Sequence, residues 1–177
     1  MTVKRKEEVK ERGGISGLNL NLNLSANQIS IFLLKFLAVS AVFLAVWYYI
    51  GEFYQGVIFF FAKHILLAMG YTPVQISAVD LSGAYLGNFN LVPLVALAIA
   101  TPGWGLKKRG EMLVIGVPLL FLLHVLDLVA HFPMYFYGSE FARLVVYSIG
   151  VGGVAVPFII WFALNLFLKR KALPKEP

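Results

Sequence analysis

Three ionisable residues recur at helical spacing within one apolar stretch: His124, Asp127 and His131. Offsets of three and seven residues place them on one face of an α-helix. Ionisable side chains are costly in lipid, so this face is a candidate for ligand binding, proton relay or partner binding, with Asp127 accepting from His124 and from Arg143. Alternatively, the three side chains satisfy one another inside a helical bundle and fix the register of the helix. Both interpretations stay open at the level of sequence.

A metal site is a poor match to the same three residues. Imidazole and carboxylate groups bind several transition metals. However, seven residues of helix span about 10 Å, so three ligands on one helix cannot converge on one ion without other chains. The sequence therefore predicts no metal and no other cofactor.

Asn88 and Asn90 flank the start of another apolar stretch. Asparagine commonly caps a helix N-terminus, where unpaired backbone N–H groups and the positive end of the helix dipole lie. The same place would suit an anionic nucleophile such as a thiolate. Because the chain contains no cysteine, thiol catalysis, disulfides and zinc thiolate sites are excluded, and helix capping is the simpler role.

The composition indicates that these residues lie in a membrane protein. Of the 177 residues, 59% are hydrophobic and 14% are charged, whereas soluble domains carry roughly 25% charged residues. The formal charge of +6 is concentrated in three short basic blocks beside apolar stretches, at residues 4–12, 107–109 and 169–175. The positive-inside rule places all three blocks in the cytoplasm. This segregation argues against nucleic-acid binding.

Four apolar segments are predicted to cross the bilayer as helices. Their ranges are residues 29–50, 89–104, 111–131 and 141–168, and a helix rises about 1.5 Å per residue through about 30 Å of hydrocarbon. Residues 47–49 (Trp-Tyr-Tyr) are expected to form an aromatic belt at the outer interface. Small residues and prolines mark positions where a helix packs closely or bends: Gly116, Pro118, Gly150, Gly152, Gly153 and Pro157.

The segment at residues 53–69 is predicted to lie along the outer surface as an interfacial helix that Gly70 ends. A fifth crossing would put one basic block outside, and Glu52, Gln55, Gly56 and Lys63 share one side of such a helix. Residues 71–88 then read as short extended pieces and turns. A short outer loop with Pro133 and Gly138 is expected between the last two crossings.

The predicted fold class is an all-α integral membrane protein with four transmembrane helices and one extracytoplasmic interfacial helix. Residues 1–27 form a basic cytoplasmic tail and linker, residues 28–170 the membrane domain, and residues 171–177 a second cytoplasmic tail. Both termini are cytoplasmic and the location is the plasma (cytoplasmic) membrane. The LNLNLNL segment at residues 18–24 is predicted to be a linker, with a short strand against a partner as the alternative.

Three motifs follow in order from residue 66. LLAMGYTPVQIS leads to Asn88-Phe89-Asn90-Leu91, GLKKRGEMLVIGVPLLFLL leads to His124-Val125-Leu126-Asp127, and Tyr147-Ser148-Ile149-Gly150 lies in the last crossing. This order resembles the exosortase and archaeosortase family of multi-pass membrane enzymes, which are thought to cleave and transfer proteins at C-terminal sorting signals. The resemblance implies that the three motifs meet at one site on the outer side.

The chain departs from that family at each motif. The position of the family's cysteine nucleophile holds Asn88, the position of its arginine holds Asp127, and the third position holds Tyr147. An amide cannot form the thioacyl intermediate of such a transfer, and a carboxylate reverses the charge that would steady an oxyanion. The resemblance thus implies a non-catalytic relative, with a candidate polar pocket or partner-binding site at Asn88, Asn90, His124, Asp127, His131, Arg143 and Tyr147.

The leading functional hypothesis is an accessory or assembly subunit of a membrane complex. Its expected partners are membrane lipids and other membrane-protein subunits. One alternative is a small structural subunit of a respiratory, photosynthetic or oxygenase-type complex, with His124, Asp127 and His131 near a pigment, haem or metal. Another is an enzyme of different chemistry with Asp127 as a carboxylate base.

Overall fold

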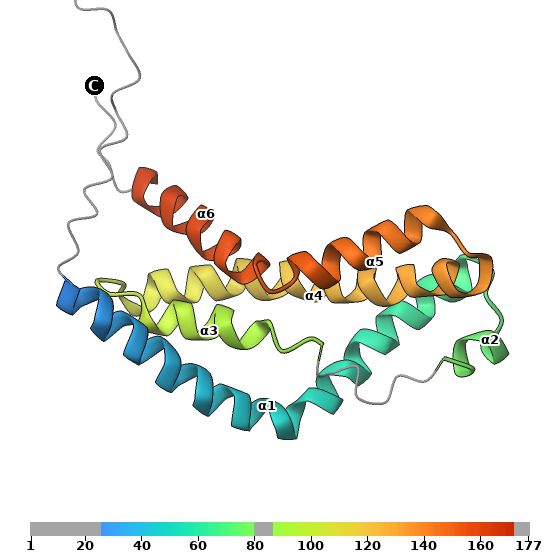
Figure 1. Cartoon of the computed structure of the whole chain (residues 1–177), viewed down its shortest axis with the longest axis horizontal. Helices are drawn as coiled ribbons and strands as arrows, with labels where there is room; N and C mark the ends of the chain where they lie inside the picture. Colours follow the sequence, from blue (N-terminus) through green and yellow to red (C-terminus); the bar gives the residue numbers. More distant parts are fainter. Residues whose placement is uncertain (1–25, 80–86, 172–177) are drawn as a thin grey trace, which may run out of the picture.

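The structure, a computed structural model, describes residues 26–79 and 87–171. The helices in these ranges are α1 (Ala26–Ala68), α2 (Pro73–Ser77), α3 (Leu91–Ala100), α4 (Leu106–Tyr137), α5 (Glu140–Gly152) and α6 (Val156–Lys171). Within the described ranges there is no strand, so the all-α class is confirmed. Figure 1 shows α4 along the long axis, with α1 and α3 below it and α5 and α6 above it. The LNLNLNL segment and both predicted tails fall largely outside the described residues.

Two helices, α1 and α4, are long and apolar enough to cross a membrane. The pair α5 and α6 would make a third span if its members are taken together across their 71° bend. Helix α3 has ten residues, about 15 Å of helix, which is half the thickness of the hydrocarbon core. The structure therefore supports a membrane protein with two or three candidate spans.

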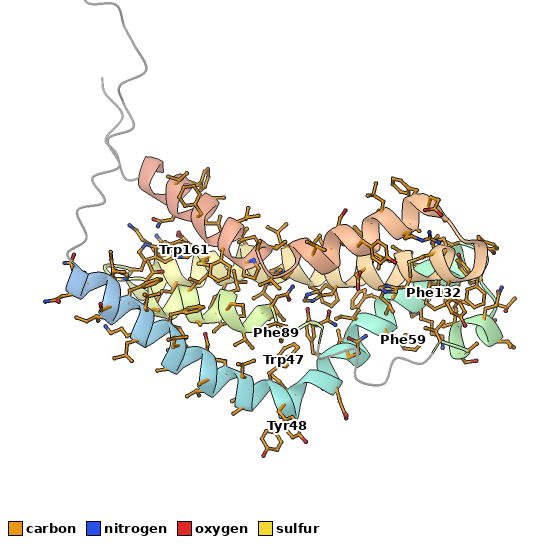
Figure 2. The ribbon with its side chains drawn as sticks, viewed as in Figure 1. Trp47, Tyr48, Phe59, Phe89, Phe132 and Trp161 are labelled. Carbon is orange, nitrogen blue, oxygen red and sulfur yellow. The ribbon has the colours of Figure 1, made fainter. Side chains whose placement is uncertain are left out.

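Helix α1 is continuous where two separate helices were predicted. It includes both residues 29–50 and the expected interfacial helix at 53–69. Gly51 lies between the two predicted segments, and one glycine costs about 1 kcal/mol relative to alanine, which is too little to end a long helix. The helix bends instead, near Trp47 and Tyr48 (Figure 2). The predicted end is confirmed, since Gly70 adopts a φ of +92° just after the last turn.

The aromatic belt and the segment after Gly70 also differ in part from expectation. Tyr48 and Tyr49 are exposed, as side chains at a membrane interface would be, but Trp47 is buried and its ring packs 5.2 Å from that of Tyr54. Residues 73–77 form α2 rather than an extended piece. A capping box between Thr72 and Gln75 starts this short helix.

Helix α4 extends beyond the predicted 111–131 at both ends. Pro133 lies inside the helix, and the connection to α5 is only Gly138 and Ser139. Gly138 has a φ of +61°, and the Ser139 hydroxyl accepts from the backbone N–H of Ala142. The prediction that Pro133 lies in a loop was therefore wrong, because membrane helices tolerate proline where neighbouring helices cover them.

Packing positions predicted from small residues and prolines are found on α4 and at the α5–α6 break. A Cβ on Gly116 would lie 2.8 Å from the Leu94 side chain, so α3 and α4 approach closely there. Residues 153–155 separate α5 from α6, and the chain turns by 71°. A bend, one of the two roles predicted for Gly150, Gly152, Gly153 and Pro157, is therefore found between α5 and α6.

The apolar core consists of two clusters along α1 and α4. The first joins α1, α3, α4 and α6 and includes Trp47, Leu91, Leu94, Leu97, Met112, Leu120 and Ile160. The second joins α1, α2 and α4 and includes Ile58, Ala62, Leu66, Tyr71, Ile76, Leu128 and Phe132. Tyr54 packs against both clusters. Buried polar groups gather beside this junction.

Candidate functional site

A cavity of about 440 Å³ lies between the middle of α1, the turn before α3, the second half of α4 and the end of α5. Five of the seven residues predicted from sequence line it: Asn88, Asn90, His124, Asp127 and His131. Arg143 and Tyr147 do not line it. Tyr147 is exposed, and Arg143 pairs with Glu140 across 2.9 Å on the surface of α5.

His124 is the centre of a buried hydrogen-bond chain. The Tyr54 hydroxyl lies 2.8 Å from Nδ1 of His124, and Nε2 of His124 lies 2.7 Å from Oδ1 of Asn90. The other side of the Asn90 amide reaches the Gly153 carbonyl oxygen at 3.3 Å. His124 and Asn90 are only 3% and 7% exposed, so these bonds replace contacts with water.

The direction of each bond in this chain follows from its last acceptor. A carbonyl can only accept, so Nδ2 of Asn90 donates to Gly153 and Oδ1 of Asn90 faces His124. Nε2 of His124 must therefore carry the proton and donate. Nδ1 of the neutral ring is then bare and accepts from the Tyr54 hydroxyl. Both nitrogens of His124 are consequently committed to protein partners.

Pro157 explains why the Gly153 carbonyl needs a partner outside its own helix. In a continuous helix this carbonyl would accept from the N–H four residues later. Proline has no N–H, so the acceptor is left without its usual donor. The amide of Asn90 supplies one from another helix, which links the break between α5 and α6 to α3 and α4.

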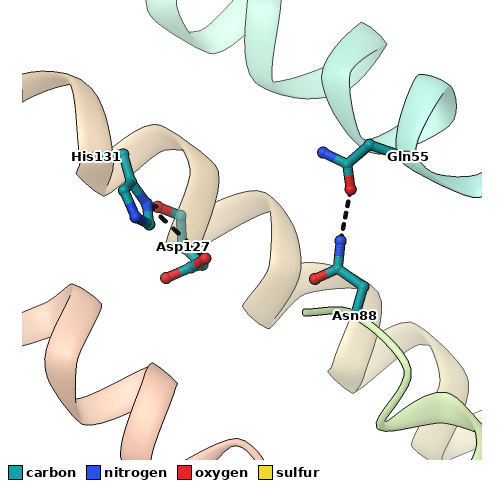
Figure 3. A network of polar contacts seen from close by, with 4 residues as sticks. All are labelled: Gln55, Asn88, Asp127 and His131. Carbon is teal, nitrogen blue, oxygen red and sulfur yellow. Dashed lines mark hydrogen bonds and ion pairs between the residues drawn. The ribbon is translucent and has the colours of Figure 1, made fainter. Parts of the chain in front are cut away.

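Asn88 and Asn90 do not cap α3. Asn90 occupies the N-cap position, yet its side chain makes no capping hydrogen bond. Nδ2 of Asn88 donates instead to Oε1 of Gln55 at 2.6 Å (Figure 3). The capping prediction was wrong because each amide has an acceptor on another segment of the bundle, and these contacts hold the turn before α3 against α1 and α5.

Asp127 has different neighbours from those expected. His124 bonds Tyr54 and Asn90 instead, and Arg143 bonds Glu140. Nδ1 of His131 donates to the backbone oxygen of Asp127 at 2.7 Å and lies 3.8 Å from its carboxylate (Figure 3). The common helical face was predicted correctly, since all three side chains line the cavity. His124, however, bonds Tyr54 and Asn90, whereas His131 contacts Asp127.

Two residues of α1 complete the site and were not predicted as part of it. Gln55 was expected to share one side of an interfacial helix with Glu52, but it is buried and lines the cavity. Tyr54 had no distinguishing signal among many aromatic residues. Both reach the site because the second half of α1 packs against α4, which hydropathy alone does not reveal.

The groups at the cavity can hold a guest through hydrogen bonds and charge. The chain has no cysteine, and both ring nitrogens of His124 are bonded to other residues of the protein. No group of three His, Asp or Glu side chains that could hold a metal ion is found in the described part of the chain. The cavity offers a carboxylate, amides and an imidazole to a guest.

No known protein family, curated protein or solved structure matches this chain. Functional inference therefore rests on the cavity and on the residues that line it.

Proposed function

We propose that this chain is a non-catalytic, exosortase-like membrane protein that acts as an accessory or assembly subunit of a membrane complex and binds part of its partner in the cavity. One observation carries this proposal. The three segments that resemble the family's motifs, residues 88–91, 124–127 and 147–150, each contribute to the lining of one cavity: Asn88, His124 and Asp127, and Gly150. Segments far apart in sequence thus meet where the resemblance implies a site.

The hydrogen bonds at the cavity support a binding role. Two polar groups of the motif segments are bound to other parts of the protein: Asn88, at the position of the family's nucleophile, to Gln55, and His124 to Tyr54 and Asn90. A histidine that acts as a general base needs a free ring nitrogen within reach of its substrate, which His124 lacks. Asp127 and His131 remain at the cavity and are the groups that a partner would contact.

The proposed topology has four crossings with both ends in the cytoplasm. Its support is that the start of α1, the α3–α4 connection and the end of α6 lie at the same end of the molecule (Figure 1). Lys107, Lys108 and Lys171 belong to this end, as the positive-inside rule requires of cytoplasmic segments. In this topology α3, which covers about half of the hydrocarbon thickness, belongs to the second crossing, and the cavity beside its N-terminal end lies in the outer half of the membrane.

Lipid contact is supported by the outer faces of the helices. Large apolar side chains are exposed along the whole bundle, among them Leu34, Leu37, Val114, Leu122, Leu144 and Phe162. Surfaces of this extent are buried by lipid or by other subunits.

Isolation of the full chain from its native membrane tests the proposal. A tagged protein in mild detergent is expected to bring a membrane-protein partner in fixed proportion. Val154→Trp should fill the cavity that Val154 lines and release the partner, whereas Val151→Trp, on an exposed site outside the cavity, should retain it. Peptide cleavage or transfer by the purified protein that Asn88→Ala abolishes would overturn the proposal, as would the absence of any partner.

A further inference from the structure

Hydrogen bonds between the residues around the cavity already use several of its side-chain donors. Nδ2 of Asn88 serves Gln55, Nδ2 of Asn90 serves Gly153, and Nε2–H of His124 serves Asn90. Among the described residues at the cavity, the side-chain donors outside these bonds are the amide N–H₂ of Gln55 and one N–H of each asparagine. The acceptors outside these bonds include the negatively charged carboxylate of Asp127.

Three acceptor groups of the described residues remain at the cavity. The Asp127 carboxylate has no Lys or Arg nitrogen within 4.0 Å among the residues that the structure describes. Oδ1 of Asn88 lies on the side toward Asp127 in Figure 3 and accepts no hydrogen bond from the described residues. Nδ1 of His131 donates to a backbone oxygen, so Nε2 of the neutral ring is an acceptor.

Asp127 is the residue that most needs a partner. A carboxylate within a membrane helix is costly unless it is paired or hydrogen-bonded. Its nearest charged neighbour, His131, is 3.8 Å away and carries charge only when protonated. Arg143 on the facing helix α5 is already paired with Glu140. Among the residues that the structure describes, the Asp127 carboxylate thus lies at a cavity without a Lys or Arg partner.

We infer that the cavity accepts a basic side chain, Lys or Arg, from a membrane segment of the partner subunit, with Asp127 as the counter-charge. This inference rests on the proposed function and names the chemistry of its partner. An ammonium group brings three donors and a guanidinium five, which match the Asp127, Asn88 and His131 acceptors. An anion would face the carboxylate, and a metal ion would find too few ligands in the described part of the chain.

The test uses the full chain reconstituted in phosphatidylcholine vesicles with a fluorescent Leu-Ala transmembrane peptide. One peptide carries a single Lys in its outer third, and its match carries Gln at that position. Energy transfer measures the association, and the Lys peptide is expected to bind about tenfold more tightly than the Gln peptide. A tenfold difference in affinity corresponds to the contribution of one charge-assisted hydrogen bond. Asp127→Asn should abolish the difference, and Glu140→Gln should leave it intact, because Glu140 is an exposed surface residue.

A second variant guards against simple misfolding of Asp127→Asn. Asn88→Asp adds a carboxylate at the same cavity and should strengthen binding of the Lys peptide over the Gln peptide. Equal binding of the two peptides, or a difference that survives Asp127→Asn, would overturn the inference. Suppression of Lys-peptide binding by added phosphatidylethanolamine, in a manner that needs Asp127, would assign the cavity to a lipid ammonium group and would also overturn it.

The outcome is separable from that of the proposed function. A partner that co-purifies from native membrane and is unaffected by Asp127→Asn contradicts this inference alone. Asp127-dependent binding of the Lys peptide, with no partner in native membrane, supports it and contradicts the accessory role.

Discussion

Nε2 of His124 lies 2.7 Å from Oδ1 of Asn90, although the two residues are 34 positions apart. With Tyr54 on one side and Gly153 on the other, the contact joins α1, α4, the start of α3 and the α5–α6 break in one directional chain. It lies where the two apolar clusters meet. Since each donor matches one acceptor, the chain selects one register of these helices, and a shifted helix would leave buried polar groups unpaired.

Tyr54→Phe is expected to lower the free energy of unfolding by about 1 kcal/mol. The change removes only the hydroxyl that donates to His124 and leaves Nδ1 without a donor, and hydrogen bonds between membrane helices are worth about 0.6 to 1.7 kcal/mol. Thermal or detergent denaturation of the purified protein measures the loss. Tyr49→Phe is the matched control, since Tyr49 is 82% exposed and should tolerate the change. Equal effects of the two changes would contradict the proposed hydrogen-bond chain.

Pro157→Ala should reduce the importance of Asn90. Alanine supplies an N–H four residues after Gly153, so the carbonyl at the end of α5 gains a competing donor from the start of α6. In a double-mutant cycle, Asn90→Ala is expected to cost about 0.5 to 1 kcal/mol less in the Pro157→Ala background than in the native chain. Additive costs would show that the Asn90 amide does not compensate for the proline.

Gly116→Ala should destabilise the bundle by about 1 to 3 kcal/mol, the usual range for overpacking a close interface. The new Cβ would lie 2.8 Å from Leu94, which is fully buried, and 3.3 Å from Ile160. Gly110→Ala in the same helix is the control, because a Cβ there meets nothing within 4 Å. Alanine at position 110 should be neutral or stabilising by up to about 1 kcal/mol through helix propensity. A tolerated change at Gly116 would mean that α3 and α4 are further apart than the structure shows.

Residue types predict much of this fold because few backbone structures satisfy their own hydrogen bonds within a lipid bilayer. Uninterrupted apolar runs and segregated charge predict helices, and Gly70, Gly103 and Gly138 mark three of their ends with positive φ values. The sequence does not reveal that α1 continues past Gly51, because a glycine can either bend or end a helix. Nor does it show that Pro133 lies within α4, since neighbouring helices decide whether a proline is tolerated.

The sequence predicts which residues of the site share a face of one helix, but it does not predict which residues of other helices they contact. Spacing alone places His124, Asp127 and His131 on a common face of α4. Their partners depend on which segments approach that face, and Gln55 and Tyr54 arrive only through the bend of α1. Arg143 was expected at Asp127, but a Glu three residues earlier on the same helix offers it a closer partner at 2.9 Å.

Asp127→Asn is expected to abolish the preference for a basic partner without lowering the stability of the protein. Within the described part of the chain the carboxylate has no basic partner closer than His131 at 3.8 Å, so an amide of the same shape removes a charge that is costly in a membrane. The free energy of unfolding is expected to stay level or to rise by about 0.5 to 1 kcal/mol, because residues that serve function often lower the stability of a protein. Glu140→Gln, which breaks an exposed pair, should change it by less than about 0.5 kcal/mol. Denaturation of the two variants beside the native chain measures both values. A loss above about 1 kcal/mol for Asp127→Asn would mean that the carboxylate stabilises the helix bundle. This structural role would then account for a carboxylate at the cavity without a basic residue from a partner subunit.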